Sequence, residues 1–227
     1  GRDGDAQSTI ATFTMTVALP HDVKGTHMSR FVEILERPRP AFDLAGFRAM
    51  LEAMLDRLEA VDGKIEMRFP YFVRKAAPMS GVESLLEYQG RWLAEARGGA
   101  ATVWAEAVVP VKSLCPCSKE ISDYGAHNQR SHITLAVRLR EPMTPDALVR
   151  LAEEEASCEV FGLLKRPDEK WVTERAYDNP KFVEDLVRDI ALRLMDEPRI
   201  AEWKVASENF ESIHNHSAYA ELFGSNA

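Results

Sequence analysis

The sequence predicts an α+β fold in which antiparallel β-sheets carry helices on one face. Some segments alternate polar and apolar residues as strands do, others repeat apolar residues at helical spacing, and the strands come in pairs with helices between the pairs. This order occurs twice, on either side of the turn signal Gly98-Gly99. The sequence has no glycine-rich phosphate loop of the Walker or Rossmann type, which argues against a doubly wound parallel sheet.

The first half is predicted to contain two strands, a helix and two further strands. Residues 9–19 alternate threonine with apolar residues, which is typical of a half-buried strand, and residues 29–35 are the second predicted strand. Asp43 is a suitable cap for a helix that should end near Asp62-Gly63. Residues 64–75 and 83–97 predict the other two strands. The apolar residues of the predicted helix are Leu44, Phe47, Met50, Leu51, Met54, Leu55 and Leu58.

The second half repeats this order. Residues 102–111 and 132–140 predict strands, Thr144-Pro145 and Asn179-Pro180 each predict the start of a helix, and Pro198 should end the second helix. Residues 200–207 and 217–223 predict the last two strands. We therefore expect two domains, residues 1–98 and residues 99–227, although the two halves share no residue-level identity.

Composition excludes several classes of partner. No apolar run approaches the roughly 20 residues that span a bilayer, so we expect no membrane partner. A net charge of −8 argues against nucleic acid, whereas a small anionic substrate would need only a local basic pocket. The three cysteines are an odd number, and Cys115 and Cys117 are too close for an unstrained disulfide, so we expect reduced thiols and a cytoplasmic location.

Residues 113–132 concentrate two of the three cysteines and two of the six histidines. A thiolate and a neutral imidazole suit borderline divalent cations, and the polar loop between Cys117 and His127 lets both side chains turn toward one point. Two ligands do not complete a structural zinc site, which favours an open catalytic site completed by a carboxylate and water. Ordinary packing or a solvated loop is the alternative interpretation.

A second cluster lies near the end of the chain, where His214 and His216 follow Glu211. Histidines two residues apart on an extended segment point the same way, and one of them could act as a general acid or base near neutral pH. The alternative is a surface strand with solvated histidines.

Four stretches together, residues 24–30, 113–132, 157–185 and 208–219, closely resemble the prokaryotic type IB GTP cyclohydrolases. The resemblance covers nearly the whole chain. It implies two tandem tunnelling-fold modules, with the metal site in the second, and a homotetramer with active sites at subunit interfaces. It also implies conversion of GTP and water to 7,8-dihydroneopterin triphosphate and formate, the entry step to folate and related pterins.

The resemblance also implies roles for individual residues. The metal ligands would be Cys117, His127 and Glu169, although Glu169 alone would read as an exposed turn acid. This mixture of soft, borderline and hard donors would accept zinc, manganese or ferrous iron, and no organic cofactor is implied. His214 would transfer protons, with Glu211 and His216 as supports.

For the substrate, the resemblance implies that Glu184 accepts two hydrogen bonds from guanine. The alternative is a surface ion pair between Glu184 and Arg188, four residues apart on a helix. The triphosphate needs cations and hydroxyl groups, which neighbouring subunits would supply together, whereas the role of Cys115 stays open. The candidates for triphosphate binding are Lys24, His27, Ser29, Arg30, Arg130 and Ser131.

Two other functions compete with this hypothesis. The nitrile-reducing oxidoreductase of queuosine synthesis shares the tunnelling fold but needs NADPH. Its Glu-Ser-Lys cofactor motif does not occur in this sequence, where the most similar run is Glu211-Ser212-Ile213. A metal-buffering or purine-sensing protein would keep Cys117 and His127 but would bind metal or GTP without turnover.

Overall fold

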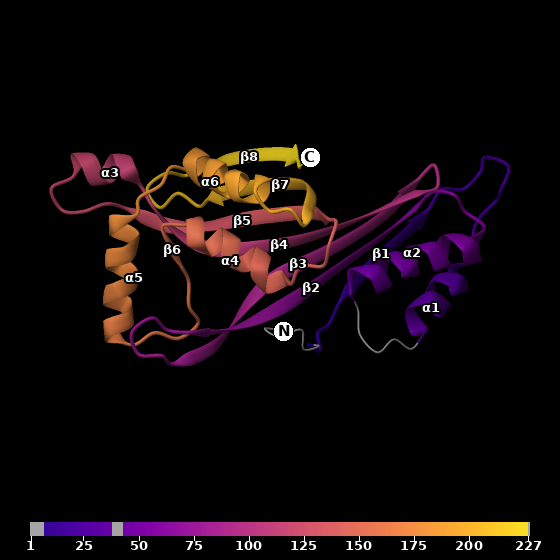
Figure 1. Ribbon diagram of the computed structural model, residues 1–227, viewed down its shortest axis with the longest axis horizontal. Coiled ribbons are helices and arrows are strands. Elements are labelled where there is room, and N and C mark those ends of the chain that lie inside the picture. Colours follow the sequence, from indigo (N-terminus) through magenta and orange to yellow (C-terminus); the bar gives the residue numbers. More distant parts are fainter. Residues whose placement is uncertain (1–6, 38–42, 227) are drawn as a thin grey trace.

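The computed structural model describes residues 7–37 and 43–226, which form one antiparallel sheet of eight strands with helices along it (Figure 1). The strand order is β1-β2-β3-β4-β5-β7-β8, and the short strand β6 pairs with β4 outside this order. The strands are β1 (Thr12–Val17), β2 (Gly63–Ala76), β3 (Glu83–Arg97), β4 (Ala100–Leu114), β5 (Asn128–Leu139), β6 (Cys158–Glu159), β7 (Ile200–Asn209) and β8 (Ala218–Ser225).

The helices lie in two groups, with α1 and α2 near one end of the sheet and the others toward the opposite end (Figure 1). Within the described ranges no helix is long and apolar enough to cross a membrane. The helices are α1 (Met28–Glu36), α2 (Leu44–Leu58), α3 (Pro116–Ile121), α4 (Pro145–Glu155), α5 (Arg166–Asp178) and α6 (Val183–Met195).

Most predicted elements are confirmed, but the strand predicted at residues 29–35 is wrong. This segment forms helix α1, in which Phe31 and Ile34 are buried three residues apart while Val32 is exposed. That spacing places the two buried side chains on one helical face. The helix predicted to open at Asn179-Pro180 begins later, at Val183, and helices α3 and α5 were not predicted.

The core lies on one side of the sheet because apolar residues meet across the strands in register. One such row runs from β2 to β7 through direct cross-strand partners, which are Met67, Trp92, Ala105, Val137 and Trp203. The turn predicted at Gly98-Gly99 is confirmed, with positive φ at both glycines, and it joins β3 to β4 without interrupting the sheet. The division into domains 1–98 and 99–227 stays a prediction.

Two glycines lie directly opposite aromatic residues on the neighbouring strand. Gly90 pairs with Phe69, and a Cβ atom on Gly90 would lie 2.7 Å from the phenyl ring. Gly224 pairs with Trp203, and a Cβ atom there would lie 2.5 Å from the indole ring. Each aromatic ring therefore occupies the space that a side chain on the opposite strand would need.

Helix α4 is tied to the β2–β3 hairpin near both of its ends. Near its start, the Tyr71 hydroxyl donates a 2.5 Å hydrogen bond to Asp146. Near its end, Glu153 accepts hydrogen bonds from the Tyr88 hydroxyl at 2.6 Å and from the Lys75 ammonium group at 2.8 Å. Burial is the main cause that raises the pKa values of Tyr88 and Glu153, so this is a poorly solvated polar cluster.

The sheet forks at the end that carries α3. The register of β3 with β4 begins at Gln89, so the first residues of β3 pair with β2, whereas Val111 and Lys112 of β4 pair with β6. Helix α5 spans the fork (Figure 1). At its C-terminal end the Lys119 ammonium group of α3 donates a 2.5 Å hydrogen bond to the carbonyl oxygen of Tyr177.

The N-terminal end of α5 is held to the β2–β3 loop by Asp168. Its carboxylate accepts hydrogen bonds from the backbone N–H groups of Met79, Ser80 and Lys165 and from the Ser80 hydroxyl, at 2.6 to 2.9 Å. Burial alone would raise the pKa of Asp168, but these hydrogen bonds outweigh burial and hold the pKa well below its usual range. Both ends of α5 are thus fixed to different arms of the fork.

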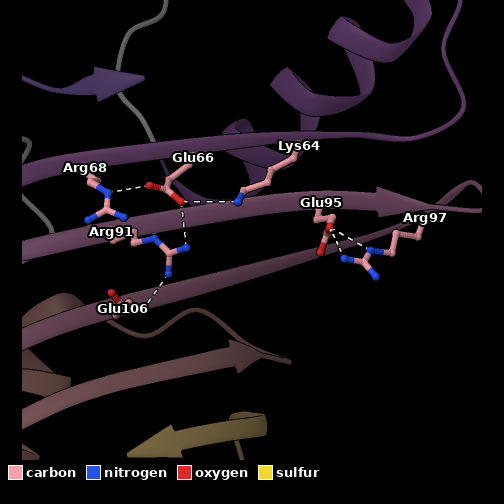
Figure 2. Close-up of polar contacts among 7 residues, drawn as sticks. All are labelled: Lys64, Glu66, Arg68, Arg91, Glu95, Arg97 and Glu106. Atoms are coloured by element: carbon pink, nitrogen blue, oxygen red, sulfur yellow. Dashed lines mark hydrogen bonds and ion pairs between the residues drawn. The ribbon is translucent and has the colours of Figure 1, made fainter. Parts of the chain in front are cut away.

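The face of β2, β3 and β4 opposite the apolar row carries a connected set of charges (Figure 2). Arg91 lies between Glu66 and Glu106, with N···O distances of 2.9 Å to each, and Glu66 also bonds Arg68 at 2.6 Å. Hydrogen bonds from Arg91, and then from Arg68, lower the pKa of Glu66 to about 2. The folded-state pKa of Glu66 lies below its ordinary value of 4.5. Ionised Glu66 therefore stabilises the fold fully above pH 4.5, and this stabilisation is lost as pH falls toward the folded-state pKa.

Replacing Glu66 with glutamine is expected to lower the free energy of unfolding by about 1 to 2 kcal/mol at pH 7, after allowance for solvent screening. The difference from the wild type should shrink as pH falls from 4.5 toward 2, because wild-type Glu66 becomes protonated in that range. Urea unfolding at several pH values measures it. Glu95→Gln, which removes the more exposed pair with Arg97 in Figure 2, should change stability by less than about 0.5 kcal/mol. A Glu66→Gln deficit independent of pH would contradict the assignment.

Candidate functional site

The loop predicted to carry the metal ligands is closed by backbone and hydroxyl hydrogen bonds. It leaves β4 after Leu114 and returns to β5 at Asn128, its cross-strand partner. The N–H group of Cys115 donates to the carbonyl oxygen of His127 at 3.2 Å, and the Ser118 hydroxyl bridges the same two residues. Cys117 is exposed in the first turn of α3. The predicted donors Cys117 and His127 therefore belong to one compact loop.

The segment between β7 and β8 continues alongside the start of β5. The N–H group of Phe210 donates to the carbonyl oxygen of Arg130 at 3.0 Å, and the ring nitrogen Nδ1 of His127 lies 3.2 Å from the Ser212 hydroxyl. The Gln129 side-chain amide donates a longer bond, 3.4 Å, to Glu211. These contacts bring Glu211 and the residues after it to the Cys/His loop.

His214 and His216 lie on the bent segment between β7 and β8 rather than on a strand. Their rings are stacked, with centroids 5.1 Å apart and planes inclined by 17°, so both imidazoles face the same region as the sequence predicts. Both side chains are exposed and thus open to a ligand from solvent.

The start of helix α6 borders the same loop. The N–H group of Lys181 donates to the carbonyl oxygen of Leu114 at 3.3 Å, just before the cysteines. Glu184 follows in the first turn of α6 and is exposed. Arg188 pairs with Asp185 at 2.6 Å, and in the described part of the chain it makes no ion pair with Glu184. The alternative role of Glu184 as the partner of Arg188 thus has no support in this structure.

Beneath these loops lies a buried polar chain across β4, β5 and β7. The hydroxyl oxygens of Ser113 and Ser131 are 2.7 Å apart, and the Ser131 hydroxyl donates to Asn209 at 2.6 Å. Ser131, predicted to bind the triphosphate, has no exposed surface. Arg130, the next candidate on β5, is exposed and points to the other face of the strand.

Glu169, the third predicted metal ligand, lies apart from the other two. It occupies the first turn of α5, where it pairs with Arg166 at 2.9 Å, beside the Asp168 anchor. Helix α5 approaches α3 at Tyr177, eight residues further on, which is about 12 Å along the helix axis. Among the described residues, no three His, Cys, Asp or Glu side chains are grouped so that they could hold a metal ion. Within the described residues, the three predicted ligands are therefore not brought together, and their assignment stays a prediction.

The candidates for triphosphate binding near the N-terminus lie toward the opposite end of the sheet. At that end the backbone N–H group of Ala18 donates a hydrogen bond to the carbonyl oxygen of Asp62. The candidates Lys24, His27 and Ser29 come shortly after Ala18 in the sequence, and all three are exposed. Arg30 is partly buried and donates a 2.9 Å hydrogen bond to the carbonyl oxygen of Arg57. Strand β4, which runs from that end to the Cys/His loop, is about 45 Å long for its 15 residues. One chain does not bring the two groups together.

Sequence reasoning missed three side chains that support the site, namely Ser113, Asn209 and Ser212. Ser113 carried a recognisable signal, since it continues the buried positions Val109 and Val111 at a spacing of two in β4. A polar residue at a core position needs a hydrogen-bond partner, and that partner could not be named without the register of three strands.

The chain is similar to known proteins along almost its whole length. The family model described as "Type I GTP cyclohydrolase folE2" matches residues 1–220. "GTP cyclohydrolase FolE2 1" of Dechloromonas aromatica is 70% identical over 224 residues, which cover 98% of this chain and 84% of that relative. "GTP cyclohydrolase FolE2" of Nitrosococcus oceani is 60% identical over 221 residues, covering 97% of this chain and 83% of the relative.

Among solved structures, the chain resembles the uricase of Arthrobacter globiformis, with a TM-score of 0.53 and 10% identity over 98% of this chain and 92% of the other. A urate oxidase from Bacillus sp. TB-90 gives a TM-score of 0.53 and 6% identity over 87% of this chain and 77% of the other. At these identities the likeness concerns the fold alone. It confirms the predicted α+β class with an antiparallel, tandem tunnelling-fold sheet.

Proposed function

The chain belongs to the type I GTP cyclohydrolase family, and on this premise we propose that it converts GTP and water to 7,8-dihydroneopterin triphosphate and formate. This reaction is the first step of folate and pterin biosynthesis. The observation that carries the proposal is the family match over residues 1–220. It is supported by the meeting of the Cys115–His127 loop, the start of α6 and the segment after Asn209 at one end of the sheet.

Guanine recognition is assigned to Glu184. Its exposed carboxylate in the first turn of α6 can accept two hydrogen bonds, from the N1 and N2 groups of guanine. Adenine lacks this pair of donors and would leave the carboxylate unpaired against the ligand, so the enzyme should discriminate strongly against ATP.

Proton transfer is assigned to His214, with Glu211 and His216 as supports. When water adds to C8 of guanine, it must lose a proton, and N9 must gain one as the bond between C8 and N9 breaks. An imidazole can take the first proton and return it to N9, because it exchanges protons near neutral pH. A second hydrolysis then releases formate, and the ribose carbons close the new ring with loss of water.

A divalent ion stays part of the proposal, with zinc, manganese and ferrous iron as candidates and with Cys117, His127 and Glu169 as its ligands. Cys117 and His127 offer the sulfur and nitrogen donors that such ions accept, and when bound the ion would activate water. Cys117 and His127 lie in one loop, whereas Glu169 lies in the first turn of α5, so the assignment of Glu169 rests on the family resemblance alone. No organic cofactor is proposed.

We propose further that the enzyme is a homotetramer whose active sites lie between subunits. The support is the separation of Lys24 and His27 from Cys117 along β4, since one chain supplies these groups at opposite ends of its sheet. The outer strands β1 and β8 are open to a second copy, and β8 exposes Tyr219 and Phe223. Residues of one subunit would then complete the triphosphate site of another.

Mixing two variants with different defects tests whether the site is shared between subunits. Lys24→Ala combined with His27→Ala should weaken GTP binding, whereas Cys117→Ala should abolish turnover. Co-expressed chains should regain about a quarter of the wild-type activity per site, because random assembly gives that share of sites with both halves intact. Two variants that both affect the Cys/His loop, Cys117→Ala and His127→Ala, should not complement each other. Equal recovery by both mixtures, or by neither, would argue against sites shared between subunits.

A cytoplasmic location is the last part of the proposal. Cys115, Cys117 and Cys158 are all free thiols, as expected in a reducing compartment.

The direct test incubates the full chain with GTP and a divalent metal and measures formate together with a fluorescent pterin after oxidation. We expect both products in equal amounts with GTP and neither with ATP. Tight binding of metal or GTP without formate would replace the proposed enzyme with a binding protein.

A further inference from the structure

Three polar side chains form a continuous hydrogen-bonded chain inside the sheet, directly below the candidate site. Ser131 and Asn209 are direct cross-strand partners on β5 and β7, and Ser113 lies diagonally across from Ser131 on β4. The exposed fractions are 2% for Ser113, 0% for Ser131 and 5% for Asn209. Solvent therefore cannot replace any bond within this chain.

The direction of the hydrogen bonds follows from the number of protons. The Ser131 hydroxyl has one proton, which it donates to the side-chain oxygen of Asn209 at 2.6 Å. The 2.7 Å contact with Ser113 must then be donated by Ser113. Loss of the Ser131 hydroxyl would break both bonds, whereas loss of the Ser113 hydroxyl would break one.

Each member of this chain adjoins a different part of the candidate site. Ser113 lies near the end of β4, two residues before Cys115, and Ser131 lies near the start of β5, four residues after His127. Asn209 is the last residue of β7, and the segment with Glu211 and His214 follows it. These three hydrogen-bonded side chains thus join the three strand ends from which the site residues project.

We propose that Ser113, Ser131 and Asn209 are positioning residues, which hold the Cys/His loop and the His214 segment at the separation that turnover requires. The proposal rests on the cyclohydrolase activity described above and reassigns Ser131 from contact with the triphosphate to this buried role. Displacing reacting groups by about 1 Å can lower a rate by about a hundredfold, so these bonds matter more for turnover than for substrate affinity.

Strand β7 supplies a matched control in Ser207. Its side chain is also fully buried, and its hydroxyl oxygen has no hydrogen-bond partner among the described residues. Ser207→Ala removes the same atom from the same strand, two residues before Asn209, without breaking a bond. A second control is Ile65→Val on β2, which removes a buried methyl group from the apolar cluster that α1 and α2 form with β2 and β3.

The test compares kcat and KM for formate release from GTP by the full chain. Ser131→Ala and Asn209→Ala should lower kcat by about 10- to 100-fold with KM for GTP within about twofold. Ser113→Ala should have a smaller effect on kcat, because it breaks one hydrogen bond where Ser131→Ala breaks two. Ser207→Ala should match the wild type, and Ile65→Val should lower Tm while leaving kcat unchanged.

Three results would overturn the proposal: wild-type kcat in Ser131→Ala, a fall in kcat that only follows the folded fraction, or a rise in KM with kcat unchanged. The last result would return Ser131 to substrate binding. Wild-type protein that releases no formate would instead refute the proposed activity, so the two failures are distinguishable.

Discussion

Cys117→Ala is expected to lower the rate of formate release by roughly a thousandfold or more and to remove bound divalent metal from the purified protein. Cys117 is the more exposed of the two free thiols in the loop that His127 closes, so its sulfur is a soft donor that an ion at this end of the sheet can reach. Elemental analysis of protein purified without chelator gives the metal content, and the formate assay gives the rate.

Two matched variants separate the possible causes of that loss. Cys158→Ala removes a buried thiol whose pKa burial raises to about 11, so the group stays protonated and out of reach, and activity should persist. His214→Ala should keep the metal and lose turnover, because it removes only the proton-transfer group. Loss of metal in His214→Ala would show that the two roles were assigned to the wrong residues.

Lys75→Met is expected to lower the free energy of unfolding by about 3 kcal/mol at pH 7, the largest stability effect among the substitutions considered. The side chains of Lys75 and Glu153 are only 11% and 12% exposed, and their charged groups are 2.8 Å apart. Without the ammonium group, the hydrogen bond from Tyr88 is the one that Glu153 keeps among the described residues. A buried carboxylate without a compensating cation is strongly unfavourable.

The loss of unfolding free energy in Lys75→Met should depend on pH. Burial already raises the pKa of Glu153, and loss of Lys75 removes the neighbour that lowers this pKa most. A carboxyl group whose folded-state pKa lies above its unfolded value favours folding at low pH, and that benefit disappears as pH rises through the folded-state pKa. Urea unfolding should therefore show a smaller deficit at pH 5 than at pH 7. Lys75→Met combined with Glu153→Leu should recover most of the loss, and failure to do so would mean that packing around Lys75 dominates.

The long strands could be predicted from the sequence because each buries one face. The alternation of apolar residues in β2 and β4 and the Gly98-Gly99 turn between β3 and β4 suffice to predict the hairpins. Helix α5 spans the fork instead of covering the core, so its buried residues are Asp168 and Ala176. It therefore has no apolar stripe from which a helix could be predicted. The start signal Arg166-Pro167-Asp168 was nevertheless present. The segment of α1 was too short for its period to be distinguished from that of a strand.

The candidate site also has parts that the sequence predicts and parts that it does not. The nearness of Cys117 and His127 follows from a single loop, and the pairing of His214 with His216 follows from their spacing. The position of Glu169 depends on the direction of α5, which Asp168 fixes through contacts with residues nearly 90 positions away. The partners of Ser131 likewise depend on strand register, which no local pattern contains.

The glycine and aromatic pairs described in the sheet have a consequence for how these long strands find their alignment. If β2 slipped by one residue against β3, the ring of Phe69 would no longer face Gly90 and would meet a neighbouring residue that carries a Cβ atom. The same holds for Trp203 and Gly224 on the other side of the molecule. The space beside each glycine accepts the aromatic ring in a single strand alignment. Misaligned hairpins are therefore disfavoured by steric clashes before any active-site residue is in place.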